Sequence, residues 1–261
     1  MPQYRYIYGP VPSWRLGSSL GIDLLSQEEK ICNFDCIYCQ LGPTKKHAIE
    51  RKIYVSVEKV IEELGGLSDT NIDYITFSGR GEPALAANLG EAVKAVKLIR
   101  KESVAVITNG SLMGLGEVRE ELSLADFVIV KLDACSPDAL EKINRPSKDI
   151  EFEGILEGLK EFRNKYEGKL ALQIMFIENN KDYISQYIHL VNHIKPDEVQ
   201  VNTPLRFCNI KPLTREEILR IKSHFISACK GINAVSVYDE RVLKDISSIS
   251  DEETLKRRGK S

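Results

Sequence analysis

Three closely spaced cysteines are the residues of this 261-residue chain most able to do chemistry. Cys32, Cys36 and Cys39 follow the pattern C-x3-C-x2-C, with Tyr38 just before the last of them. Three thiolates in one short loop can hold three irons of a [4Fe–4S] cluster and leave the fourth iron without a protein ligand. An iron with an open position can bind and activate a small molecule, which a cluster held by four cysteines cannot readily do. The loop therefore predicts a reactive iron–sulfur site.

Other uses of the cysteine loop stay open at this point. A zinc ion could take the three cysteines and His47, which lies a few residues further on. Zinc sites usually combine two cysteine pairs, so a loop without a second pair fits zinc poorly. A disulfide framework is less expected, because six cysteines in 261 residues are sparse and we expect no signal peptide. An iron–sulfur electron carrier and a zinc-binding protein remain the alternatives to an enzyme.

The composition is that of an ordinary globular protein. Apolar residues make up 43% of the chain, which is enough for a sizeable core in one large α/β domain. No apolar run approaches the roughly 20 residues that span a bilayer, so we expect no membrane segment and a cytoplasmic location. The formal charge of −2 and the pI near 6.2 disfavour a nucleic-acid partner without excluding one. We expect the basic run 256–260 to be a solvated tail.

Apolar segments alternate with amphipathic ones along most of the chain. The apolar segments are rich in Val, Ile, Phe and Leu, as expected of parallel strands that are covered on both faces. The predicted strands are Ser19–Leu25, Ile72–Phe77, Val104–Thr108, Phe127–Leu132, Leu170–Ile177 and Glu198–Asn202. A further piece, 234–238, can extend the sheet.

Between these strands, apolar residues recur with the 3.6-residue period of helices that rest on a sheet, within 89–99, 155–162 and 184–194. Ser136-Pro137 and Thr214-Arg215-Glu216-Glu217 predict two helix starts. Alternating strands and helices imply a parallel sheet with right-handed crossovers, which can curve into a full or partial TIM-like barrel. We expect the barrel domain over residues 1–245, including an N-terminal extended segment, followed by a C-terminal helix or flexible tail at 246–261.

Together with these elements, the cysteine loop resembles that of the radical S-adenosylmethionine (SAM) superfamily. The resemblance implies a partial (β/α)6 barrel, a [4Fe–4S] cluster on the three cysteines, and SAM as the second cofactor. In this family the open iron chelates the amino and carboxylate groups of SAM, and an electron from the cluster breaks the sulfonium C–S bond to yield a 5′-deoxyadenosyl radical. The resemblance also implies that Tyr38 lies beside the adenine.

In barrels of this kind, active groups sit on the loops that follow the carboxyl ends of strands. The second predicted strand ends in Ser78-Gly79-Arg80-Gly81-Glu82-Pro83, which resembles the Gly-Gly-Glu-Pro motif of the superfamily. We expect Ser78, the backbone of Gly79 and Gly81, and Glu82 to bind the SAM amino group, because a carboxylate can receive an ammonium. The alternative is a tight turn in which Glu82 caps the next helix.

The third and fourth strand ends carry Asn109 and the pair Lys131 and Asp133. The resemblance implies that Asn109 and Asp133 orient the ribose or methionine part of SAM. Asn109 could instead belong to a plain turn, because Asn-Gly favours positive φ. Strand alternation puts Lys131 and Asp133 on one face, where an ion pair between them is the alternative.

Four residues are expected on the substrate side of the site: Lys131, Cys135, Arg206 and Cys208. The guanidinium of Arg206 suits an anionic group of the substrate or SAM, or a carboxylate such as Asp133. A thiol near the adenosyl radical could return a hydrogen atom to a substrate radical. Cys135 and Cys208 could also ligate a second metal or act as small apolar residues, as we expect of Cys229 in the core.

The amino-terminal part of the sequence resembles one particular group within the superfamily. The run Tyr8-Gly9-Pro10-Val11-Pro12-Ser13-Trp14-Arg15-Leu16-Gly17, with Ser19-Leu20-Gly21-Ile22 after it, is similar to the opening of a wyosine-base-synthase-related radical SAM group. Trp14 stands where that group has an arginine, which argues against an anion contact at this position. The tRNA-modifying wyosine enzyme has a second cluster with its own upstream cysteines, and no cysteine precedes Cys32 here. A tRNA substrate is therefore not assigned.

These patterns lead to one functional expectation. We expect an enzyme that cleaves SAM reductively and uses the 5′-deoxyadenosyl radical to abstract hydrogen from an RNA base or a peptide or protein side chain. The alternative function is that of a glycyl-radical-enzyme activase, whose substrate is a partner enzyme. The expected partners are SAM and a reductant such as ferredoxin or flavodoxin.

Overall fold

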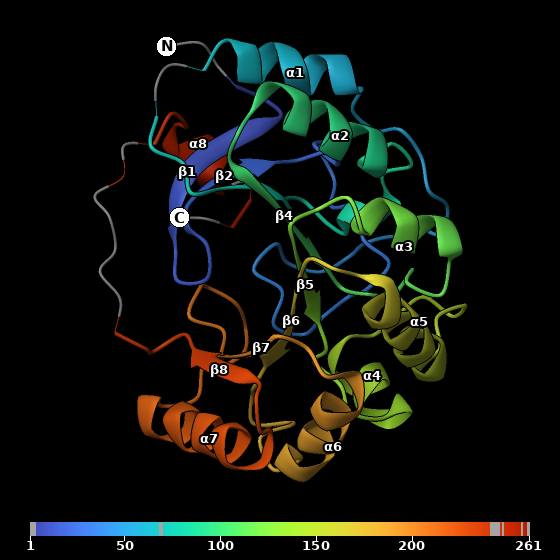
Figure 1. Ribbon diagram of the computed structural model, residues 1–261, viewed down its shortest axis with the longest axis vertical. Coiled ribbons are helices and arrows are strands. Elements are labelled where there is room, and N and C mark those ends of the chain that lie inside the picture. Colours follow the sequence, from blue (N-terminus) through green and yellow to red (C-terminus); the bar gives the residue numbers. More distant parts are fainter. Residues whose placement is uncertain (1–3, 68–69, 241–245, 247, 257, 260–261) are drawn as a thin grey trace.

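The computed structural model describes the chain except for residues 1–3, 68–69, 241–245, 247, 257 and 260–261. Within the described residues, eight strands form one sheet whose spatial order follows the sequence (Figure 1). The strands are Ile7–Ser13 (β1), Gly17–Ile22 (β2), Tyr74–Phe77 (β3), Ser103–Thr108 (β4), Phe127–Lys131 (β5), Lys169–Met175 (β6), Glu198–Asn202 (β7) and Asn233–Ser236 (β8). The first two strands pair antiparallel, and all later neighbours pair parallel.

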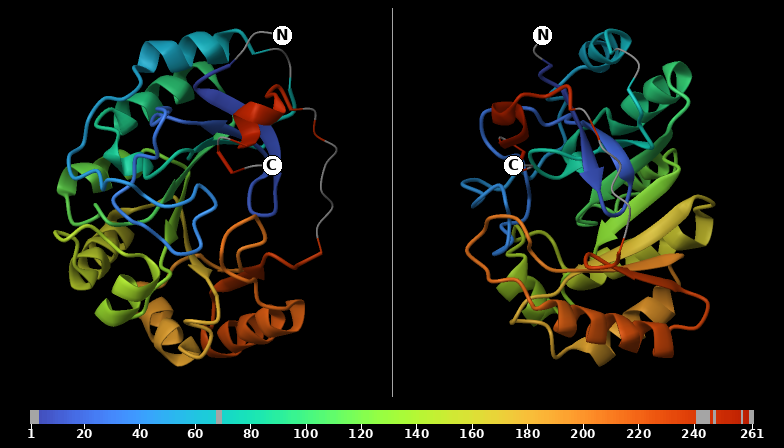
Figure 2. Two further views of the ribbon diagram at one scale, coloured as in Figure 1. Left: turned by 180° about the vertical axis from the view of Figure 1, so that it is seen from behind. Right: turned by 90° about the vertical axis from the view of Figure 1, so that its left-hand side faces the viewer.

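The sheet curls, and helices cover its outer face (Figures 1 and 2). The helices are Val57–Gly65 (α1), Leu89–Ile99 (α2), Gly116–Leu122 (α3), Pro137–Ile143 (α4), Phe152–Lys165 (α5), Ile184–Ile194 (α6), Arg215–Ala228 (α7) and Glu252–Lys256 (α8), with a 3-10 turn at Pro83–Leu85 (η1). Their apolar stripes are buried against the sheet, as shown in α2 by Leu89, Val93 and Val96. The predicted helix starts are confirmed, because Ser136 caps α4 and Thr214 forms a capping box with Glu217 at α7.

The predicted α/β partial barrel is confirmed. The six strands predicted from sequence correspond to β2–β7 with small shifts at their ends, and β8 extends the parallel sheet as expected. The amino-terminal segment was expected to be extended but not to join the sheet, and as β1 it adds an antiparallel strand at the other edge. None of the described helices is long and apolar enough to cross a bilayer.

The hairpin of β1 and β2 also contributes to the barrel interior. Tyr8 pairs with Gly21 in register, and a Cβ at Gly21 would come within 2.0 Å of Cζ of the Tyr8 ring, so only glycine leaves room for the ring. The turn before β2 places Leu16 among inward-facing side chains of β4, β5 and β6: Ala105, Phe127, Ile129 and Ala171. This turn therefore packs inside the barrel at the amino ends of the parallel strands.

The C-terminal segment returns to this hairpin. Figure 2 shows α8 beside β1, and the backbone N–H of Gly9 donates to Oγ of Ser250 at 2.9 Å. Arg258 is fully buried, and its Nε donates to Oδ2 of Asp23 at 3.0 Å. The expectation of a solvated basic tail is therefore wrong for Arg258, because the segment folds back and pairs with a buried carboxylate. The predicted domain boundary at residue 245 lies outside the described residues and stays a prediction.

Candidate active site

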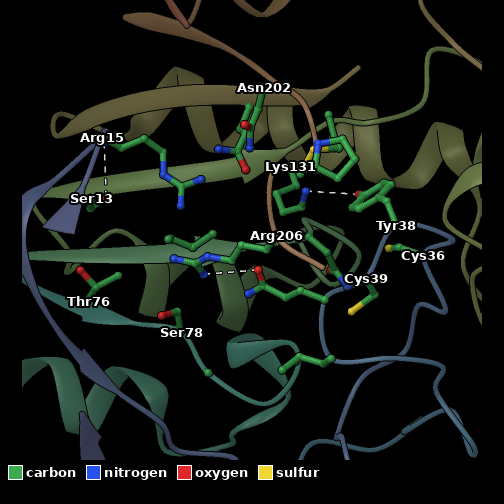
Figure 3. A pocket seen from close by; sticks show the side chains of 18 of the residues that line it. Ser13, Arg15, Cys36, Tyr38, Cys39, Thr76, Ser78, Lys131, Asn202 and Arg206 are labelled. Carbon is green, nitrogen blue, oxygen red and sulfur yellow. Dashed lines mark hydrogen bonds between the residues drawn. The ribbon is translucent and has the colours of Figure 1, made fainter. Parts of the chain in front are cut away.

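A cavity of about 420 Å³ lies inside the half-barrel (Figure 3). Cavities of a few hundred Å³ commonly hold small-molecule ligands. Eleven of the fourteen predicted site residues line it: Cys32, Cys36, Tyr38, Cys39, Ser78, Gly79, Gly81, Glu82, Asn109, Lys131 and Arg206. The remaining three do not: Asp133, Cys135 and Cys208. Loops that are far apart in sequence thus meet at one cavity, as the strand-end rule predicted.

The three cysteines lie on the loop that follows β2. The side chain of Asn144 donates to Sγ of Cys36 at 3.3 Å. Burial raises the pKa of the Cys32 thiol, and it raises the pKa of Cys36 to about 11. Thiols in such surroundings stay protonated at neutral pH unless a metal ion replaces the proton. The loop therefore suits metal binding better than free thiolate chemistry.

The described residues show no preformed site for a single metal ion. Among the residues that the structure describes, no three His, Cys, Asp or Glu side chains converge closely enough to hold one metal ion. The zinc site with His47 is therefore not formed. A zinc ion with bonds of about 2.3 Å needs its sulfurs closely packed around it. A four-iron cluster presents a separate iron to each cysteine, so it does not require the three thiols to meet at one ion.

Backbone contacts join the cysteine loop to the loop after β3. The N–H of Ile31 donates to the carbonyl of Arg80 at 2.9 Å, and the N–H of Glu82 donates to the carbonyl of Ile31 at 3.0 Å. Gly81 has a φ of 156°, and a Cβ there would lie 1.6 Å from the same Ile31 carbonyl oxygen. Gly81 is therefore required by the contact between the two loops, in addition to any ligand that they bind.

Glu82 is buried at this junction, with 2% of its surface exposed. Its carboxylate accepts hydrogen bonds from the Thr108 hydroxyl at 2.5 Å, the Asn109 N–H at 2.6 Å and the Ala84 N–H at 3.0 Å. The last of these caps η1, so the capping role considered from sequence is present. Burial raises the pKa of Glu82 to about 7, although the three hydrogen bonds act in the opposite direction. A bound ammonium would favour the charged form again.

Asn109 also supports the cysteine loop. Its Nδ2 donates to Oδ1 of the buried Asn33 at 2.9 Å, and its Oδ1 accepts from the Ser111 N–H at 2.9 Å. Asn33 in turn donates to the Ser111 hydroxyl at 2.8 Å. Asn109 thus belongs to a turn and also lines the cavity, so both functions considered from sequence are compatible with its position.

Tyr38 is held in place by charged groups at the end of β5. Its hydroxyl donates to Asp133, and Nζ of Lys131 lies 4.8 Å from the centre of its ring. Lys131 and Asp133 form the ion pair considered as an alternative, with Nζ and Oδ2 3.0 Å apart. The other carboxylate oxygen of Asp133 accepts from the Met175 N–H at 2.7 Å. Asp133 therefore positions Tyr38 from outside the cavity lining, and this arrangement does not support its predicted direct contact with SAM.

The residues expected on the substrate side divide into two groups. Lys131 and Arg206 line the cavity, whereas Cys135 and Cys208 do not. Arg206 donates to Oε1 of Gln40 at 3.3 Å, so it is not the partner of Asp133. All six cysteines are free thiols, and the positions of Cys135 and Cys208 give no support for hydrogen-atom donation into the cavity.

Sequence reasoning missed the contribution of the hairpin to this site. Tyr8, Ser13, Trp14 and Arg15 also line the cavity. The hydroxyl of Tyr8 lies 2.7 Å from Oγ of Ser78, which links β1 to the loop that carries Glu82. The motif in residues 8–17 was recognised in the sequence, but it gave no indication that this segment would turn into the barrel.

The fold is that of a radical SAM enzyme. Residues 30–191 match the family model described as the radical SAM superfamily, and the chain belongs to this superfamily. Its members use a [4Fe–4S] cluster and SAM. A UPF0026 protein of Synechocystis sp. is 43% identical over 211 residues, which cover 80% of this chain and 78% of that protein. A UPF0026 protein of Methanocaldococcus jannaschii is 35% identical over 265 residues, which cover 93% of this chain and 81% of that protein, so UPF0026 proteins are among the sequence relatives of the chain.

Solved structures share the fold at low identity. Streptococcus suis SuiB bound to S-adenosylmethionine matches with a TM-score of 0.63 and 14% identity, covering 82% of this chain and 49% of SuiB. Archaeal TYW1 matches with a TM-score of 0.55 and 17% identity, covering 80% of this chain and 72% of TYW1. The chain therefore spans about half the length of SuiB, and these two likenesses concern the fold alone.

Proposed function

We propose that Cys32, Cys36 and Cys39 hold the [4Fe–4S] cluster and that the cavity binds SAM for reductive cleavage. When bound, the cluster supplies the open iron for SAM and the electron that yields the 5′-deoxyadenosyl radical. The observation that carries this proposal is that all three thiols and the loop of Glu82 line one cavity. An electron carrier would need no buried carboxylate beside its cysteines.

The chain's own groups would bind and orient SAM. Glu82 would receive the SAM ammonium, because burial leaves its carboxylate without a compensating cation among the described residues. The backbone at Gly79 and Gly81 would let the methionine part approach closely. Tyr38 would lie beside the adenine, and its position is set by Lys131 and Asp133.

The cavity would direct the radical toward one hydrogen of the substrate and exclude water from it. Lys131 and Arg206 are retained as substrate-side residues, because both line the cavity. Cys135 and Cys208 would need to move before either could donate a hydrogen atom there. An RNA base or a peptide or protein side chain is the proposed substrate, and activation of a glycyl-radical enzyme is the alternative.

We also place the chain in the wyosine-base-synthase-related group, on the strength of its opening motif. The pairing of Tyr8 with Gly21 gives part of that motif a physical basis, because the glycine makes room for the ring. A cytoplasmic location with ferredoxin or flavodoxin as reductant completes the proposal. Six free cysteines agree with a reducing compartment.

Anaerobic reconstitution with iron and sulfide tests the assignment. Wild-type protein should bind four irons per chain and release 5′-deoxyadenosine from SAM when a strong reductant is added. Cys36→Ala should abolish that release. Cys229→Ala is the matched control, because Cys229 is a buried core residue outside the cavity. Full cleavage in the Cys36 variant would refute the assignment, and a wild-type cluster that leaves SAM intact would favour an electron carrier.

A further inference from the structure

Two arginines enter the cavity from opposite ends of the barrel. Arg15 comes from the turn before β2, at the amino ends of the parallel strands. Arg206 comes from the loop after β7, at the carboxyl ends. Figure 3 shows both side chains directed into the cavity. Both side chains therefore reach the barrel interior, and Arg206 also contacts Gln40, the residue that follows Cys39.

Neither guanidinium is neutralised by a carboxylate. In the part of the chain that the structure describes, neither Arg15 nor Arg206 takes part in an ion pair, although Arg206 donates to Gln40. The Nε of Arg15 is buried and has no hydrogen-bond partner in that part of the chain. Among the described residues that line the cavity, Glu82 is the only acidic one, and its oxygens accept from Thr108, Asn109 and Ala84.

Two cations held close together without a counter-charge are costly in a protein interior. Burial and the repulsion from Arg206 lower the pKa of Arg15 to about 10, which still leaves Arg15 charged at neutral pH. Such a pair is expected where a ligand supplies the missing negative charge. The planar fork of a guanidinium matches the two oxygens of a carboxylate or a phosphate.

Polar side chains line the cavity together with the two arginines. Thr76, Gln173 and Asn202 point inward from β3, β6 and β7 and line the same cavity. Leu16 and its apolar neighbours close the barrel below them. The cavity therefore offers further hydrogen-bonding groups to a ligand that the arginines would hold.

We propose that Arg15 and Arg206 bind an oxyanion of the substrate, either a carboxylate or a phosphate, inside the half-barrel. The proposal rests on the function proposed above, because it assigns the cysteine edge of the same cavity to SAM. It narrows the substrate to an anionic compound, or to the anionic part of a larger one, that reaches into the barrel.

Calorimetric titration of the reconstituted protein tests this subsite, with saturating SAM, no reductant and low ionic strength. The probes are inorganic phosphate and malonate, and glycerol is the neutral control. Saturable binding of either anion is expected, and the tighter of the two identifies the oxyanion. Arg15→Gln and Arg206→Gln should each weaken that binding by about 10-fold to 100-fold, the usual effect of losing one charge-assisted hydrogen bond. The anion affinity of Arg206→Lys should lie between those of wild type and Arg206→Gln, because lysine keeps the positive charge and lacks the planar guanidinium.

Arg220→Gln is the matched control, because it removes one positive charge from the exposed surface of α7. It should leave anion binding unchanged. Thermal unfolding of each variant checks that the fold is retained. Absence of anion binding in wild type would overturn the proposal. So would Arg15 and Arg206 variants that bind the anion with the same affinity as wild type.

Three further outcomes separate this inference from the function on which it rests. If phosphate competes with SAM and Arg206→Gln weakens SAM binding as strongly as it weakens phosphate binding, the arginines hold the SAM carboxylate and the proposal fails. If wild type releases 5′-deoxyadenosine but binds no anion, only the substrate inference fails. If the anion binds in wild type and not in the variants, but SAM is neither bound nor cleaved, the proposed function fails and the oxyanion site stands.

Discussion

The ionisation of Glu82 offers a quantitative test of the site before any substrate is known. Its pKa is raised from 4.5 to about 7 in the folded protein, chiefly by burial. Between these two values the unfolded chain has released the proton and the folded chain still binds it. The free energy of unfolding therefore falls as the pH rises through this window. The full effect is about 3 kcal/mol, of which about 2.5 kcal/mol falls between about pH 5 and pH 8.

Glu82→Gln removes this ionisation. The variant loses one hydrogen-bond acceptor, which shifts its stability by an amount that does not depend on pH. The free energy of unfolding is measured by urea denaturation of the cluster-free, reduced proteins. From about pH 5 to pH 8, that of wild type should fall by about 2.5 kcal/mol relative to that of the variant. Glu216→Gln, on the exposed surface of α7, is the control and should run parallel to wild type. If the free energy of unfolding of Glu82→Gln also changes with pH in parallel with that of wild type, the raised pKa of Glu82 is refuted.

Three further perturbations test the contacts around the site. Gly81→Ala should reduce the iron bound after reconstitution, because its Cβ would displace the Ile31 carbonyl; iron equal to wild type would contradict the loop contact. Arg258→Met should lower the free energy of unfolding in urea by about 3–5 kcal/mol by leaving buried Asp23 unpaired, and adding Asp23→Asn should recover part of it. Tyr8→Phe should cost about 1 kcal/mol by the same assay, the value of one hydrogen bond, and a neutral result would mean that water replaces the bond.

The sequence was informative wherever the signal is local. The cysteine spacing, the buried strands and the two capped helix starts each depend on a few neighbouring residues, and the structure has the expected strands and caps. Cys229 is in the core as its helical spacing indicated. The strand-end rule also brought most predicted site residues to one cavity, because parallel strands align their carboxyl ends.

Contacts between residues far apart in the chain could not be predicted from local sequence patterns. Asp23 and Arg258 are 235 residues apart and form a buried ion pair that no local pattern indicates. The alternation that put Lys131 and Asp133 on one face was correct, but alternation does not say whether a side chain faces the cavity or a neighbour such as Tyr38.

The sequence by itself indicated the class of chemistry and a parallel α/β sheet, because metal-ligand spacing and strand periodicity are properties of short segments. The resemblance to the superfamily then selected the partial barrel. Only the tertiary structure decided which groups share the cavity. The β1–β2 turn carries Arg15 into the barrel because Tyr8 packs on Gly21 and Leu16 packs between the strands. That arrangement depends on the shape of surfaces distant in sequence, so Arg15 and Arg206 became a pair only when the chain was folded.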